Sequence, residues 1–155
     1  PLLLLVGPFE SDIWENKAET DQFKQRTLEL IKKYPNEIFH FRVNKKIEYY
    51  YKAADIFVLP SRNEGLPNAL LEAMASSLAC IIMENEGHQE ILNNNVDGII
   101  FRNENDIDLK INLLRLVQNE EKLVSLQKSG RNTVKKSYSI NLVVYKYLQL
   151  YRSLI

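Results

Sequence analysis

The chain has 155 residues, 45% of them hydrophobic and 26% charged, a composition typical of one soluble globular domain with its own core. Twenty basic and twenty acidic residues cancel, so no overall field draws the chain to nucleic acid or to an anionic membrane. Cys80 is the only cysteine, which excludes an intramolecular disulfide and predicts a buried thiol in a reducing compartment.

The apolar opening PLLLLV is too short to span a membrane, which takes roughly 18 residues or more. It also lacks the basic leader and the cleavage site of a signal peptide. Because the chain enters this run directly after Pro1, we expect a segment of a longer parent protein. We expect that parent to be cytoplasmic, and its association with the cytoplasmic membrane face stays open.

Apolar runs of strand length recur at residues 2–6, 37–41, 55–60, 79–83 and 98–101. Their apolar character is continuous rather than alternating, which is typical of parallel strands covered on both faces. Helical periodicity lies between them, and the last third of the chain reads as helix only. The repeat predicts an α/β fold, a Rossmann-like doubly wound parallel sheet with helices on both faces.

Apolar spacing defines the expected buried helix faces. The first helix, ended by Pro35, should bury Phe23, Thr27, Leu30, Ile31 and Tyr34. The second should bury Ile47, Tyr50, Tyr51 and Ala54, so the tyrosines at 49–51 are interpreted as packing residues. A third helix is expected within EGLPNALLEAMA, residues 64–75, and a fourth near HQEILNNN, residues 88–95.

Ligands of doubly wound folds bind beyond the carboxyl ends of the strands. Four loops are expected there: Gly7-Pro8, residues 42–44, Ser61 to Asn68, and Asn85 to Glu90.

The loop before the third helix carries the most informative chemistry. Pro67 suits the first helical position, where its missing N–H is not needed. Gly65 permits a tight turn that leaves the first backbone amides uncovered, which is an anion site suited to a phosphate. Leu66, Leu70, Leu71 and Met74 should then form the buried face, with Asn68, Glu72 and Ser76 on the other side.

Two carboxylates, Glu64 and Glu72, flank this expected anion site. They would repel a lone phosphate, but they suit a ligand whose ribose and sugar hydroxyls lie on either side of a diphosphate. The alternative is that Glu72 is a solvated helix residue and Glu64 an ordinary turn acid near a helix N-terminus, where negative charge is favoured. Spacing alone leaves both interpretations open.

From Asp55 to Phe101 the chain resembles the C-terminal, donor-nucleotide-binding domain of family 4 GT-B retaining glycosyltransferases. The resemblance rests on a strand led by Asp55 and ending in Pro60-Ser61, the E-x7-E motif of Glu64 and Glu72, the Glu-Ala-Met-Ala run at 72–75, and Glu90 before a turn glycine, Gly98.

The resemblance implies that Glu64 contacts the transferred sugar as the catalytic residue and that Glu72 holds the ribose hydroxyls. The other donor-binding residues that it implies are Gly65, Leu66, Pro67, Asn68 and Ser61, with Gly7 and Pro8 lining the pocket and Arg42 and Val43 against the base. It implies no metal and no cofactor, with a nucleoside-diphosphate sugar as substrate. His88 is interpreted as a loop residue and His40 as a strand residue.

In the family that this chain resembles, the matched segment follows an acceptor-binding N-terminal domain and an earlier strand that carries basic residues. We therefore expect residues 1–155 to be one donor-binding domain of a two-domain enzyme, inactive alone. We also expect strands 2–6 and 55–60 to pair directly, in the order 2-1-3-4-5. The last helix, near Ile140 to Leu154, would normally cross to the other domain, and self-association through its apolar side stays open.

Two other functions compete with sugar transfer for polysaccharide or glycolipid synthesis. Ser76-Ser77 and Glu86 stand where the family usually has glycine or proline, which is compatible with a non-catalytic interaction domain. A GT-B sugar-nucleotide epimerase shares the architecture, but the Glu-Ala-Met-Ala run argues against it.

Overall fold

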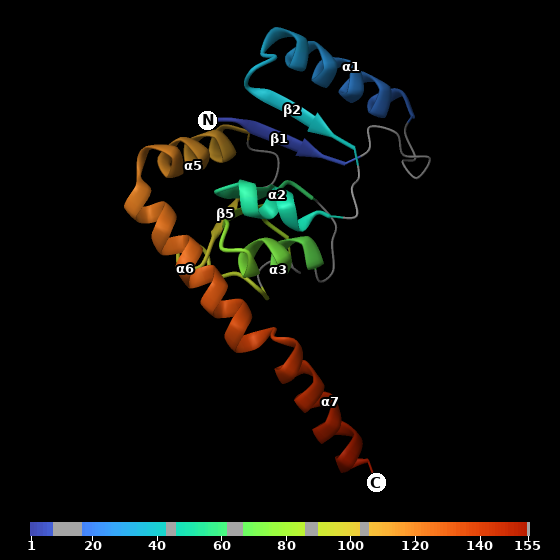
Figure 1. Ribbon diagram of the computed structural model, residues 1–155, viewed down its shortest axis with the longest axis vertical. Coiled ribbons are helices and arrows are strands. Elements are labelled where there is room, and N and C mark those ends of the chain that lie inside the picture. The colour runs from blue at the N-terminus through green and yellow to red at the C-terminus, as the bar shows by residue number, and fades with distance from the viewer. Residues whose placement is uncertain (8–16, 43–45, 62–66, 86–89, 103–105, 155) are drawn as a thin grey trace. The chain divides into compact units, whose positions relative to one another are not determined.

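The computed structural model describes residues 1–7, 17–42, 46–61, 67–85, 90–102 and 106–154. They form two compact units, Pro1–Ile47 and Glu48–Ile155. In chain order the elements are β1 (Leu3–Val6), α1 (Lys17–Lys33), β2 (Ile38–Phe41), α2 (Glu48–Ala53), β3 (Ile56–Leu59), α3 (Asn68–Ala75), β4 (Ala79–Met83), β5 (Ile99–Phe101), α5 (Asp106–Gln118), α6 (Glu120–Ser137) and α7 (Ile140–Ser153) (Figure 1). The predicted α/β class with parallel strands is confirmed.

The first unit consists of a parallel pair of strands and one helix. β1 and β2 pair from Leu3↔Ile38 to Val6↔Phe41, and α1 packs against β2. The expected buried face of α1 is wrong in part: Thr27 is buried, but Phe23 is 65% and Leu30 49% exposed. Two strands present a narrow surface, which cannot cover the whole apolar stripe of a 17-residue helix.

The second unit is built around β4, which is buried along its whole length. β4 lies between β3 and β5, and both pairings are parallel. Ala79, Ile81 and Met83 point to one face of this sheet, where they form a core with Leu116 of α5 and Leu126 of α6.

α2 contacts the opposite face of the sheet through Tyr51. Phe57 of β3 points to this face beside Cys80, its Cα partner in β4. The Phe57 ring meets the ring of Tyr51 of α2 edge to face, with centroids 6.0 Å apart. Helices therefore cover both faces, as predicted.

Within each unit the strand neighbours follow the expected order 2-1-3-4-5: β1 pairs with β2, and β3, β4 and β5 lie side by side. The expected ladder between residues 2–6 and 55–60 would join the two units, so it stays a prediction. A continuous apolar run predicts that a strand is covered on both faces, but it carries no information about which strand lies beside it.

The C-terminal third is helical, as predicted. α6 begins at an Asn119 cap, whose side chain accepts a hydrogen bond of 2.9 Å from the backbone N–H of Lys122. α7 has no buried residue, and its apolar side chains, such as Val144 and Leu148, are about half exposed. Across the described part of the chain, no helix has both the length and the apolar character needed to cross a membrane.

Candidate functional site

α3 follows β3 at the carboxyl edge of the second unit's sheet. Pro67 is its N-cap, with φ −77° and ψ 99°, so the helix begins at Asn68, one residue after the position expected for its start. Among the described residues no side chain caps this end, and the first turn contains no acidic residue. The N-terminal backbone amides and the positive end of the helix dipole therefore remain suited to an anion.

The two sides of α3 differ as the helical period predicts. Leu70 and Met74 are fully buried, whereas Asn68, Glu72 and Ser76 are exposed. Glu72 therefore presents its carboxylate to solvent one turn after the start of the helix. The prediction that these three polar residues share the solvent side is confirmed.

The Glu72 carboxylate has a partner that the sequence pattern did not reveal. The hydroxyl of Tyr51 donates to Oε2 of Glu72 over 3.3 Å, and it also lies 3.5 Å from the carbonyl oxygen of Ala69. Tyr51 also packs, as the helical spacing predicts, with only 8% of its surface exposed. A buried tyrosine usually needs a partner for its hydroxyl. The expected burial of Tyr51 therefore indicates that a partner exists, but not which residue it is.

The surroundings of Tyr51 raise its pKa to about 12. Burial is the main cause, because it disfavours the phenolate, and the charge and hydrogen bond of Glu72 add to it. Tyr51 therefore stays a neutral donor to Glu72 across the whole physiological range.

The ends of β3 and β4 are joined at the same edge of the sheet. Asn85, just after β4, donates its side-chain N–H to the carbonyl oxygen of Ser61 over 3.4 Å. The loops expected to begin at Ser61 and at Asn85 therefore start side by side, as the rule for parallel sheets predicts.

In the first unit, Gly7 ends β1 with φ +148°, a conformation that favours glycine. Its N–H donates to the Phe41 carbonyl over 3.0 Å. Its own carbonyl oxygen lies 2.8 Å from Nε2 of His40. A carbonyl oxygen can only accept, so Nε2 is the donor in this contact. His40 is a strand residue, as expected, and it also fixes Gly7, while Arg42 is exposed directly after β2.

Several expected site residues lie outside the described part of the chain, so their roles remain predictions. They are Pro8, Val43, Glu64, Gly65, Leu66 and His88. The expected fourth helix, residues 88–95, lies partly outside the described chain. The described part starts at Glu90, and residues 90–91 form a turn.

The segment from Glu90 to Gly98 is tied to α6 by side-chain hydrogen bonds. Buried Asp97 accepts from Thr133 over 2.8 Å. The Tyr138 hydroxyl donates to the Glu90 carbonyl over 3.1 Å, and Lys122 donates to the Asn95 carbonyl over 2.9 Å. This end of the loop beginning at Asn85 is therefore held by α6 and its C-terminal cap.

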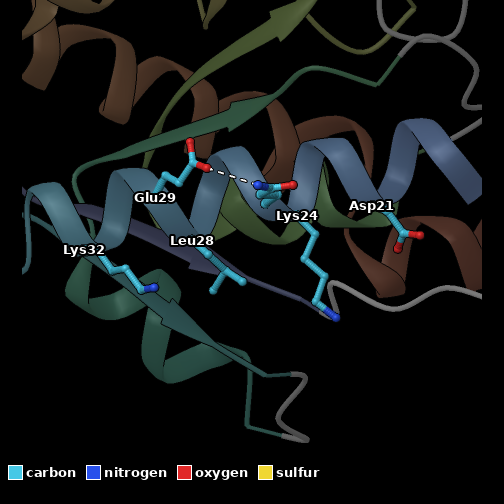
Figure 2. A pocket seen from close by; sticks show the side chains of 6 residues that line it. Asp21, Lys24, Leu28, Glu29 and Lys32 are labelled. Carbon is cyan, nitrogen blue, oxygen red and sulfur yellow. Dashed lines mark hydrogen bonds between the residues drawn. The ribbon is translucent and has the colours of Figure 1, made fainter.

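A surface hollow on α1 does not combine a helix N-terminus with a carboxylate, as the start of α3 does. Figure 2 shows its lining, which comes from this helix alone: Asp21, Lys24, Gln25, Leu28, Glu29 and Lys32. Gln25 donates to Glu29 over 3.3 Å on this exposed surface. Within the described ranges, no group of three or more His, Cys, Asp or Glu side chains could hold a metal ion.

The sequence and the fold of this chain are similar to those of known proteins. Residues 1–133 match the family model described as glycosyl transferases group 1. The chain belongs to this family. Its fold matches those of solved structures of GT-B glycosyltransferases, as the sequence resemblance implied.

Two curated proteins show how this group 1 chain relates to longer relatives. The UDP-Gal:alpha-D-GlcNAc-diphosphoundecaprenol alpha-1,3-galactosyltransferase of Escherichia coli is 39% identical over 100 residues, 64% of this chain and 26% of that protein. The N,N'-diacetylbacillosaminyl-diphospho-undecaprenol alpha-1,3-N-acetylgalactosaminyltransferase of Campylobacter jejuni is 35% identical over 97 residues, 63% of this chain and 26% of the relative. The chain thus spans about a quarter of the length of these curated relatives.

Solved structures share the fold of this group 1 chain at low sequence identity. Anabaena HepE in complex with UDP has a TM-score of 0.83 and 13% identity, covering 98% of this chain and 41% of that one. The C-terminal domain of a glycosyl transferase group 1 protein from Francisella tularensis has a TM-score of 0.71 and 23% identity, covering 80% of this chain and 66% of that one.

Proposed function

We propose that this chain binds a nucleoside-diphosphate sugar, as the donor-binding domain of a family 4 retaining glycosyltransferase. The observation that carries the proposal is the exposed Glu72 carboxylate, one turn inside a helix whose N-terminus has no side-chain cap among the described residues. An anion-binding helix end beside a hydrogen-bond acceptor matches a ligand with both phosphates and hydroxyls.

Each part of the donor has a proposed partner in the chain. Glu72 accepts hydrogen bonds from the ribose hydroxyls, and the start of α3 faces the diphosphate. Glu64 accepts from a hydroxyl of the transferred sugar, as the catalytic residue. The remaining proposed contacts come from Gly65, Leu66, Pro67, Asn68 and Ser61, and from Gly7, Pro8, Arg42 and Val43.

The proposed reaction of the parent enzyme is sugar transfer with retention. The bond from the anomeric carbon to the diphosphate oxygen breaks, and a bond to the acceptor oxygen forms on the same face. The departing phosphate oxygen takes the acceptor's proton, so no protein nucleophile is needed. We assign no metal to this step, because helix amides and basic groups can stabilise the diphosphate.

The relatives support a role in polysaccharide or glycolipid assembly. The names of both curated relatives describe transfer to diphosphoundecaprenol-linked sugars. The Anabaena structures contain UDP or UDP-glucose, which makes UDP the first base to test. The acceptor site would lie in the other domain of a two-domain parent, which we propose to be cytoplasmic.

Amide NMR would test donor binding on this chain, with UDP, GDP and ADP and their glucose conjugates added at millimolar concentration. The proposal predicts shifts at Ala69 to Glu72 and near Gly7 and Arg42 for one base, with saturation. If no nucleotide shifts these amides, the donor-binding proposal is wrong and a non-catalytic interaction domain is favoured.

A further inference from the structure

We infer that Tyr51 is a positioning residue that orients the Glu72 carboxylate toward the hydroxyls of a bound ribose. The inference rests on the proposed function, because it assigns Glu72 to the ribose. It adds a residue from a different helix, which neither the E-x7-E motif nor the tyrosine run at 49–51 indicates.

The Tyr51 ring is held firmly enough to act as a support. It is 8% exposed, and its edge-to-face contact with Phe57 joins α2 to β3. Phe57 is in turn the ladder partner of fully buried Cys80 in β4. The ring therefore belongs to the packed sheet face, while its hydroxyl reaches the solvent-exposed carboxylate on α3.

One hydroxyl proton serves two nearby acceptors, so only one bond can be donated at a time. Oε2 of Glu72 lies 3.3 Å away and the Ala69 carbonyl oxygen 3.5 Å away. The carboxylate is both nearer and charged, and charged acceptors form the stronger bond. Tyr51 therefore donates its hydrogen bond mainly to Glu72.

This bond leaves the carboxylate able to take a ligand. A carboxylate has about four acceptor positions, and Tyr51 occupies one of them on Oε2. Oε1 and the second position on Oε2 stay available for the two neighbouring hydroxyls of a ribose. Without Tyr51, an exposed glutamate side chain would have to be ordered by the ligand itself, which weakens binding.

The expected loss is modest and depends on the ligand's hydroxyls. Immobilising one flexible side chain costs about 0.5–1.5 kcal/mol, so the Tyr51→Phe variant should bind UDP roughly 2- to 13-fold more weakly. The ring and its contact with Phe57 remain in that variant. A ligand without ribose hydroxyls should bind equally to both proteins.

Isothermal titration of the 155-residue chain with UDP and with 2′,3′-dideoxy-UDP tests this. We would compare wild type, Tyr51→Phe and Tyr49→Phe, the last as a control on the exposed side of α2. The expected result is weaker binding of UDP, but not of the dideoxy analogue, in Tyr51→Phe alone.

Three other outcomes are distinguishable. An equal loss for both ligands in Tyr51→Phe, or no loss for either, would overturn the positioning role and leave the proposed function standing. A wild-type chain that binds both ligands equally would show that Glu72 does not bind the ribose hydroxyls. That result would also overturn the positioning role of Tyr51. A wild-type chain that binds neither ligand here, and that shows no response to GDP or ADP in the amide NMR titration, would overturn the proposed function and the inference with it.

Discussion

The hydroxyl of Thr133 donates a hydrogen bond of 2.8 Å to Oδ2 of Asp97, which joins α6 to a turn 36 positions earlier in the chain. Asp97 is 3% exposed. It also accepts from the backbone N–H of Asn93 over 2.6 Å and from the Asn93 side-chain amide over 3.2 Å. One buried carboxylate thus fixes both the turn and its attachment to the helix.

Removing this carboxylate should destabilise the chain. Asp97→Ala leaves the Asn93 and Thr133 donors without their acceptor, which should lower the free energy of unfolding by about 2–3 kcal/mol. Thr133→Val removes one donor and should cost about 1 kcal/mol. Urea unfolding followed by circular dichroism measures both values. If Asp97→Ala were no less stable than Thr133→Val, Asp97 would not be the centre of this network.

Gly98 should not tolerate a larger side chain, for a reason that differs from its expected role in a turn. A Cβ atom there would lie 2.2 Å from Cδ1 of Leu92 and 3.0 Å from the Cys80 carbonyl oxygen. The left-handed conformation of the turn is instead taken by Asn95, with φ 62°. Gly98→Ala should therefore lower stability by about 1–3 kcal/mol through overpacking.

A double-mutant cycle separates crowding from backbone strain at Gly98. Leu92→Val removes the nearest methyl groups, so Gly98→Ala should cost less in that background than in the wild type. Thermal unfolding of the four proteins gives the coupling energy. Equal costs in both backgrounds would show that the Leu92 contact is not the cause.

The raised pKa of Tyr51, about 12, makes the stability of the fold depend on pH above 10. The neutral phenol is the form favoured in the folded state, so its contribution is fully present below the unfolded pKa of about 10. As the pH rises from 10 through 12, the unfolded chain loses this proton first, and stability falls.

Urea unfolding at pH 8, 9.5 and 11 measures this dependence. The free energy of unfolding should fall more steeply in the wild type than in Tyr51→Phe, which has no phenol to ionise at this position. The two proteins differ only at position 51, so the comparison isolates the phenol of Tyr51. Parallel pH profiles would mean that Tyr51 ionises as easily in the folded chain as in the unfolded one.

Local patterns in the sequence predicted most of the elements, and they did so for physical reasons. Continuous apolar runs located the five described strands within one or two residues, because strands of a parallel sheet are covered on both faces. The helical period placed Leu70 and Met74 in the core and Glu72 in solvent. Helix α1 was less predictable, because the width of the sheet beneath it decides how much of its apolar stripe is buried.

Contacts between distant residues left no local trace. The Tyr51–Glu72 bond spans 21 positions and the Asp97–Thr133 bond 36, so neither follows from periodicity or spacing. A buried hydroxyl or carboxylate needs a partner, but only the fold decides which residue that partner is.

The most direct test of the account is the affinity of UDP for the wild-type chain and for Glu72→Ala, measured by isothermal titration. Glu121→Ala, at an exposed glutamate in the first turn of α6, is the matched control. Losing hydrogen bonds to a charged acceptor costs about 1.5–3 kcal/mol, so Glu72→Ala should bind roughly ten- to hundredfold more weakly while the control binds as the wild type does. Equal affinities for all three proteins would contradict the assignment of Glu72 to the donor.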